Sequence, residues 1–118
     1  MKALIVDDNL LNLKVAARLI EQAGLEVETV MSGHECVARV KNMLYDIIFM
    51  DIMMPDMDGV ETFNKLRESG VIIPIIALTA DAEAGAKERY LEVGFDDYIA
   101  KPIMMNELER VLDKYRKW

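Results

Sequence analysis

Hydrophobic residues follow two alternating patterns along the chain. Nearly continuous apolar runs at residues 3–7, 46–51 and 73–79 predict buried strands, and residues 26–30 and 97–100 predict two more. The segments between them carry apolar residues at helical spacing. These stripes are Leu13, Ala16, Ala17 and Ile20; Val37, Val40 and Leu44; Val60, Phe63 and Leu66; and Leu108, Val111, Leu112 and Tyr115. Strict alternation of strand and helix predicts an α/β fold, an open five-stranded parallel sheet with helices on both faces.

The individual segments also suggest their places in the sheet. Residues 46–51 are the most apolar and should be central, whereas the polar residues 26–30 suit an edge. Residues 82–93 have the thinnest apolar stripe, interrupted by Gly85, although a helix is still expected there. Pro74 is tolerable only near the start of the fourth strand because it lacks a backbone N–H.

Length and charge narrow the classes of function. A chain of 118 residues is sufficient for one domain, residues 1–118. Hydrophobic residues make up 53% and charged residues 30%, which is typical of globular proteins. The net charge of -7 argues against nucleic acid binding through a basic face, and against docking on an anionic membrane.

Two further features indicate a cytoplasmic protein. The single cysteine, Cys36, cannot form an intrachain disulfide, so nothing suggests an oxidising compartment. The apolar stretch at residues 3–6 is far too short for a signal peptide, and no run approaches the roughly 20 residues of a membrane span. We therefore expect a cytoplasmic location.

The most informative residues follow the predicted strands. Asp7 and Asp8 end the first strand, and Asp51 ends the third. If these strands are neighbours, three carboxylates meet at the edge where parallel α/β sheets bind ligands. Two carboxylates about 4 Å apart repel each other by about 4 kcal/mol at an effective dielectric constant of 20. Such a cluster needs a cation, and all-oxygen ligation suits Mg²⁺.

Two more polar residues belong to the same predicted edge. Thr79 ends the fourth strand and contributes a hydroxyl, and Lys101 follows the fifth and contributes a mobile positive charge. Both groups suit a phosphoryl group bound beside the metal ion. Any one of these residues could be an ordinary turn residue, but all five at one end of a sheet favour a metal and phosphoryl site.

The chain resembles the response-regulator receiver domains of two-component and phosphorelay signalling from residue 2 to about residue 115. The resemblance is carried by the motifs IVDDN (residues 5–9), MDIMMPDMDG (50–59), ALTA (77–80) and KP (101–102), and their order and spacing are specific. It implies a flavodoxin-like fold with strand order 2-1-3-4-5.

The resemblance also implies roles for individual residues. Asp51 matches the phospho-acceptor, which takes a phosphoryl group from phosphohistidine on a sensor histidine kinase or a histidine phosphotransfer protein. Asp8 and Asp51 would ligate Mg²⁺ directly, Asp7 largely through water, and Met53 through its backbone carbonyl. Thr79 and Lys101 match the residues that bind the phosphoryl oxygens.

The resemblance further implies a conformational switch. Tyr98 occupies the switch-aromatic position and would turn inward when Thr79 is drawn toward the phosphoryl group. Met53 and Asp81 occupy the positions that usually tune the lifetime of the phosphate, and their chemical effects oppose each other. The domain would be no enzyme toward an external substrate, since it would assist only its own phosphorylation and dephosphorylation. An output protein or domain is a further possible partner.

Other functions remain open at this point. An aspartyl-phosphate phosphatase also has a strand-end Asp nucleophile, but it carries a second Asp where this chain has Met53. A flavin-binding electron carrier has the same fold class, yet Asp7 and Asp8 would repel its phosphate unless a metal ion intervened. A receiver-like scaffold that works without phosphorylation is the third alternative.

The tract at residues 77–103 is similar to hybrid-kinase and phosphorelay receivers, and both a stand-alone receiver and a part of a larger regulator are compatible with the sequence.

Overall fold

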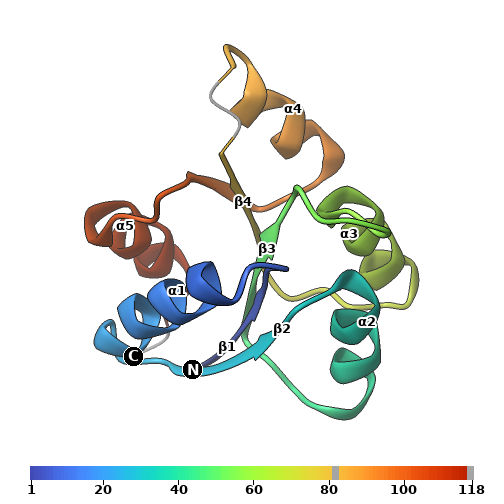
Figure 1. Cartoon of the computed structure of the whole chain (residues 1–118), viewed down its shortest axis with the longest axis horizontal. Helices are drawn as coiled ribbons and strands as arrows, with labels where there is room; N and C mark the ends of the chain where they lie inside the picture. The colour runs from blue at the N-terminus through green and yellow to red at the C-terminus, as the bar shows by residue number, and fades with distance from the viewer. Residues whose placement is uncertain (81–82, 117–118) are drawn as a thin grey trace.

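The computed structural model describes residues 1–80 and 83–116, in which five strands alternate with five helices (Figure 1). The strands are β1 (Lys2–Val6), β2 (Glu26–Val30), β3 (Ile47–Asp51), β4 (Ile75–Thr79) and β5 (Asp97–Ala100). The helices are α1 (Leu10–Gln22), α2 (Gly33–Asn42), α3 (Gly59–Glu68), α4 (Ala86–Val93) and α5 (Met105–Tyr115). Every strand pair is parallel and the order is β2-β1-β3-β4-β5, which confirms the predicted fold class and topology.

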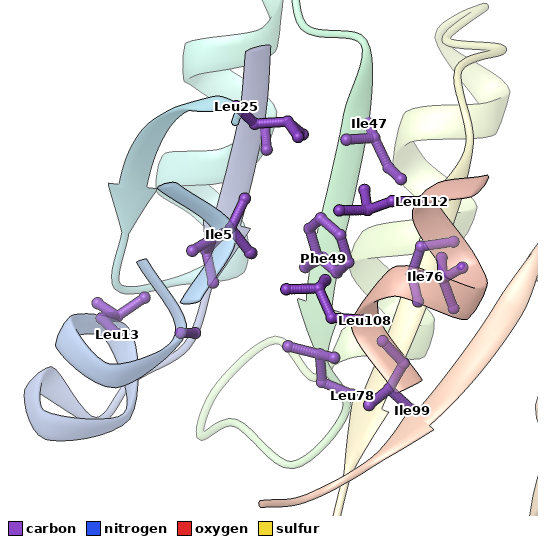
Figure 2. Packing of buried hydrophobic residues seen from close by; sticks show 14 residues of the cluster. Ile5, Leu13, Leu25, Ile47, Phe49, Ile76, Leu78, Ile99, Leu108 and Leu112 are labelled. Carbon is purple, nitrogen blue, oxygen red and sulfur yellow. The ribbon is translucent and has the colours of Figure 1, made fainter. Parts of the chain in front are cut away.

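The two faces of the sheet bury separate apolar clusters, as expected from the alternation of side chains along each strand. On one face α1 and α5 cover the sheet, and Phe49 of β3 lies at the centre of that cluster (Figure 2). On the other face α2 and α3 pack against residues such as Met50 and Ala77, and residues of α4 and the turn after it, including Phe95, join them. All five residues of β3 are buried, whereas β2 exposes Glu26 and Thr29 at the edge.

Polar side chains define where three helices begin. Asn9 accepts a hydrogen bond from the backbone N–H of Asn12 at 3.0 Å, Ser32 from that of Glu35 at 3.0 Å, and Asp58 from that of Glu61 at 2.9 Å. Each satisfies a backbone donor that the first helical turn leaves unpaired.

Several predicted boundaries were wrong. Leu44 was expected on the inner face of α2, but the helix ends at Asn42 and Leu44 is 93% exposed. The reason is that Met43 is extended and redirects the chain toward β3. The fourth strand begins at Ile75 rather than residue 73, because Pro74 cannot donate to a ladder and contributes only its carbonyl, which accepts from Ile48 N at 2.9 Å.

The helix predicted at residues 82–93 is also shorter in the structure. Gly85 has φ +85°, which is outside the helical region, and α4 therefore begins at Ala86. Residue 82 itself lies outside the described residues. None of the helices within residues 1–80 and 83–116 has the length and apolar character that crossing a membrane requires.

Candidate phosphoryl and metal site

The three predicted carboxylates meet at the carboxyl end of the sheet. Val6 and Met50 are partners across the β1–β3 ladder, so Asp7 and Asp51 follow at the same level of two neighbouring strands. One carboxylate oxygen from each of Asp7, Asp8 and Asp51 lies within 4.8 Å of the others. Asp7 and Asp51 are buried, whereas Asp8 is exposed at the mouth of the cluster. Strand order therefore brings together residues that are more than 40 positions apart in sequence.

Lys101 reaches this cluster from the other side of β4. Its Nζ lies 2.8 Å from Asp7 Oδ2 and 3.1 Å from Asp51 Oδ1. The backbone N–H of Lys101 donates to the carbonyl of Thr79 at 2.9 Å, which extends the β4–β5 ladder by one residue beyond Ala100. The following peptide bond, Lys101–Pro102, is cis. The ammonium group thus contacts both buried carboxylates at once.

The local charges determine how these groups ionise. Burial and the charge of Asp7 together raise the pKa of Asp51 to about 6, against the opposing effect of Lys101 and the N–H of Met53. Burial by itself would lower the pKa of Lys101, but its hydrogen bonds to Asp7 and Asp51 outweigh burial and raise it. One ammonium group cannot neutralise three carboxylates, so the cluster favours a further cation.

The donor set fits Mg²⁺. Carboxylate oxygens are hard ligands, and Mg²⁺ commonly uses one or two of them while it retains water molecules. Asp7 and Asp51 each use one oxygen to anchor the following turn: Asp7 Oδ1 accepts from Asn9 N at 2.9 Å, and Asp51 Oδ1 accepts from Met53 N at 3.3 Å. These bonds hold the carboxylates in place before a ligand arrives, and Asp8 lies toward solvent where an ion would enter.

Gly59 is a residue whose importance the sequence did not reveal. A Cβ at this position would lie 2.4 Å from the carbonyl oxygen of Asp51 and 2.8 Å from the Cα of Ile52. The backbone N–H of Gly59 donates to the carbonyl of Ile52 at 3.0 Å. Only a residue without a side chain allows α3 to begin this close to the end of β3.

The remaining predicted residues surround the cluster in different ways. Thr79 is fully buried at the end of β4. It follows Leu78, which is the ladder partner of Asp51. Met53 is 70% exposed, so its side chain extends into solvent. Tyr98 is half-buried on β5 opposite Ala77. The predicted lifetime residue Asp81 lies outside the described residues.

An apolar groove of about 460 Å³ opens beside the site, between α1 and the segment that follows β5. Asp7 and Lys101 form part of its wall, together with Pro102. On the α1 side Leu11 is 68% exposed and Val15 is 52% exposed. The groove therefore places accessible hydrophobic surface next to the buried charges.

A parallel sheet of this order, with an acidic cluster and a lysine at its carboxyl edge, defines the class of receiver domains. The chain belongs to this family, because the family profile described as response regulator receiver domain matches residues 3–113.

Individual relatives agree with this assignment. The chain is 43% identical to the signal transduction histidine-protein kinase BarA of Escherichia coli (strain K12), over 98% of this chain and 13% of that protein. It is 38% identical to the sensor protein GacS of Pseudomonas syringae pv. syringae, over 97% of this chain and 13% of that protein. The chain thus spans only a small part of the length of these kinases.

Solved structures show the same fold. The receiver domain of sensor histidine kinase PA1611 from Pseudomonas aeruginosa PAO1, with a magnesium ion coordinated in its active site cleft, matches with a TM-score of 0.85 and 37% identity, over 97% of this chain and 95% of that one. The chemotaxis protein CheY4 of Vibrio cholerae matches with a TM-score of 0.85 and 29% identity, over 98% of each chain.

Proposed function

We propose that this domain is a phosphorylation-dependent signalling switch that accepts a phosphoryl group on Asp51. The observation that carries the proposal is the placement of the Lys101 ammonium against both Asp7 and Asp51, within a three-carboxylate cluster. A cluster with this charge balance suits a cation together with a phosphoryl group. The receivers of histidine kinases among its relatives supply the biological context.

The proposed donor is a phosphohistidine on a sensor histidine kinase or a histidine phosphotransfer protein. A carboxylate oxygen of Asp51 attacks phosphorus and forms the new P–O bond. The P–N bond breaks, and the imidazole leaves with the bonding electron pair and takes a proton from water. The groove beside Leu11 and Val15 offers the donor protein an apolar surface next to Lys101, which contacts Asp51.

The residues of the chain act mainly by positioning and by charge. We expect Mg²⁺ to be held directly by Asp8 and Asp51, through water by Asp7, and by the backbone carbonyl of Met53. The ion would neutralise charge on the transferring phosphoryl group. Lys101 provides a second positive charge for the phosphoryl oxygens, and Thr79 provides a hydroxyl. With these roles the domain would be a phospho-acceptor that assists only its own phosphorylation and dephosphorylation, and no enzyme toward other molecules.

The signal is a change of conformation that involves Thr79 and Tyr98. Thr79 would move its hydroxyl toward the bound phosphoryl group, and Tyr98 would respond on the same face of the sheet. The phosphoryl group then shifts a pre-existing equilibrium rather than creating a new fold. Met53, exposed two residues after the acceptor, would hinder attacking water, and Asp81 would oppose that effect by positioning the water. We place this chemistry in the cytoplasm, where kinases have access to ATP.

The decisive experiment is the intact mass of the protein after incubation with acetyl phosphate, with Mg²⁺ or with EDTA, beside Asp51→Asn. The expected result is a Mg²⁺-dependent gain of one phosphoryl group that the variant lacks. If neither acetyl phosphate nor a phosphorylated histidine kinase adds the group, and Mg²⁺ does not bind in a titration, a phosphorylation-independent scaffold replaces the proposal. Sustained phosphate release from added esters would instead identify a phosphatase.

A further inference from the structure

Tyr98 is held by an aromatic ring from α4. The ring of Tyr98 is stacked on that of Tyr90, with centroids 6.2 Å apart and an interplanar angle of 12°. The Tyr90 ring meets Phe95 edge-on at 6.4 Å, and Phe95 lies 4.5 Å from Phe63 of α3. Both tyrosines are half-buried. A continuous series of rings therefore joins the predicted switch residue to α4 and α3.

The same face of the sheet carries Thr79. Ala77 and Tyr98 are partners across the β4–β5 ladder, and both belong to the cluster beneath α2 and α3. Since side chains two residues apart on a strand point to the same face, the Thr79 side chain lies on the Tyr98 face.

Most residues of helix α4 are exposed. Ala86 is the residue of α4 that is fully buried, while Leu91 and Val93 are 38% and 39% exposed. Gly85, with φ +85°, stands at the N-cap position before the helix, and it makes no side-chain capping hydrogen bond among the described residues. The stack of Tyr90 on Tyr98 is thus one contact that joins this largely exposed helix to the edge of the sheet.

We propose that Tyr90 is a positioning residue for the switch: its ring holds Tyr98 in the half-buried position and so couples α4 to the phosphoryl site. The inference rests on the proposed function. Movement of the Thr79 hydroxyl toward a phosphoryl group would make the Tyr98 face less crowded and so favour the half-buried position of the ring over an exposed one. Occupancy of the site and the Tyr90 stack then favour the same position of Tyr98, and by linkage the loss of one weakens the other.

The test compares Tyr90→Leu, which removes the ring, with Tyr90→Phe, which keeps it. The first measurement is NMR of labelled tyrosine rings in the unliganded protein, with the Tyr98 signals assigned by Tyr98→Phe. The second is a titration with Mg²⁺ and beryllofluoride, a tetrahedral mimic of a phosphoryl group on a carboxylate, with Asp51→Asn as the blank. Leu91→Ala, on the same helix, controls for a general weakening of α4.

The expected results follow from the stack. In Tyr90→Leu the Tyr98 ring signals move toward those of an exposed tyrosine, and beryllofluoride binds roughly two- to tenfold more weakly, the range that a stacked aromatic pair contributes. Tyr90→Phe and Leu91→Ala stay within about twofold of the wild type. A ring with a merely structural role would lower stability without changing this affinity.

Two results overturn the inference: Tyr98 signals that do not change in Tyr90→Leu, or equal beryllofluoride affinities in Tyr90→Leu and Tyr90→Phe. Failure of the proposed function appears separately, as the absence of any mass gain in the wild type. Even then the Tyr98 signals of the unliganded protein decide whether Tyr90 holds that ring in place.

Discussion

Asp97 on β5 and Arg110 on α5 are joined by two hydrogen bonds, from Arg110 Nη1 to Asp97 Oδ2 at 3.0 Å and from Arg110 Nη2 to Asp97 Oδ1 at 3.2 Å. Lys114 Nζ lies 2.6 Å from Asp97 Oδ2, and Arg110 Nη2 also donates to the Tyr98 carbonyl at 3.2 Å. The Asp97 side chain is only 2% exposed. This carboxylate therefore ties α5 to the edge strand at the residue before Tyr98.

The ion pair makes stability depend on pH in acid. Burial would raise the pKa of Asp97, but hydrogen bonds from Arg110, Lys114 and the Tyr98 N–H outweigh burial and lower it to about 2. Because the pKa of an unfolded Asp is about 3.9, the stabilisation is complete above that value and is lost as the pH falls toward 2. Asp97→Asn should cost about 1–3 kcal/mol at neutral pH, since Arg110 and Lys114 are partly exposed and screened.

Urea unfolding across this range checks the prediction. The difference between the wild type and Asp97→Asn should shrink as the pH falls from about 5 to about 2. Asp113→Asn is the matched control, because Asp113 lies on the same helix with a side chain 64% exposed and should change stability by less than about 0.5 kcal/mol. A pH-independent difference would mean that Asp97 contributes packing rather than charge.

Asp51 should affect stability in the opposite sense. Its folded pKa of about 6 lies above the unfolded value of about 3.9, so the folded state binds the proton more tightly. Stability without Mg²⁺ should therefore fall as the pH rises from about 4 to about 6, and Asp51→Asn should be more stable by about 1–2 kcal/mol at pH 7. Urea unfolding in EDTA measures both effects, and a variant less stable than the wild type at pH 7 would contradict them.

Gly59→Ala should disturb the site through the backbone. The new Cβ would meet the carbonyl oxygen of Asp51, so α3 has to shift, at a cost of about 1–3 kcal/mol and with weaker Mg²⁺ binding. Asn64→Ala is the control, because Asn64 is exposed inside the same helix and alanine favours helix there. Thermal unfolding and a calorimetric Mg²⁺ titration report the two effects, and unchanged values in Gly59→Ala would refute the close approach.

Asp8 and Asp56 provide a matched test of the metal site. Both are exposed carboxylates near the carboxyl edge, but only Asp8 belongs to the acidic cluster. Asp8→Asn should weaken Mg²⁺ binding roughly tenfold or more, because a carboxylate ligand becomes neutral. Asp56 has φ +64°, a conformation that Asn also adopts, so Asp56→Asn should keep both the turn and the affinity. Equal losses in the two variants would indicate a general charge effect instead of ligation.

Much of the fold was predictable because strands and helices leave different hydrophobic periods in a sequence. The most apolar run became the central, fully buried β3, and the polar run became the edge strand β2. The errors occurred at element ends, where backbone geometry outweighs periodicity. Leu44 continued the helical stripe in sequence, yet the extended Met43 ends α2 and leaves Leu44 in solvent.

The sequence by itself determined which residues stand at the carboxyl ends of the strands, because that depends only on the position of each residue within a local pattern. Asp7, Asp8, Asp51, Thr79 and Lys101 could all be placed at this edge from their spacing. The tertiary structure decided which side chains touch. Lys101 contacts two carboxylates of the cluster, Tyr90 stacks on Tyr98, and Arg110 forms an ion pair with Asp97. Each of these contacts joins different elements, so it depends on how helices and strands pack in three dimensions, which no local period encodes.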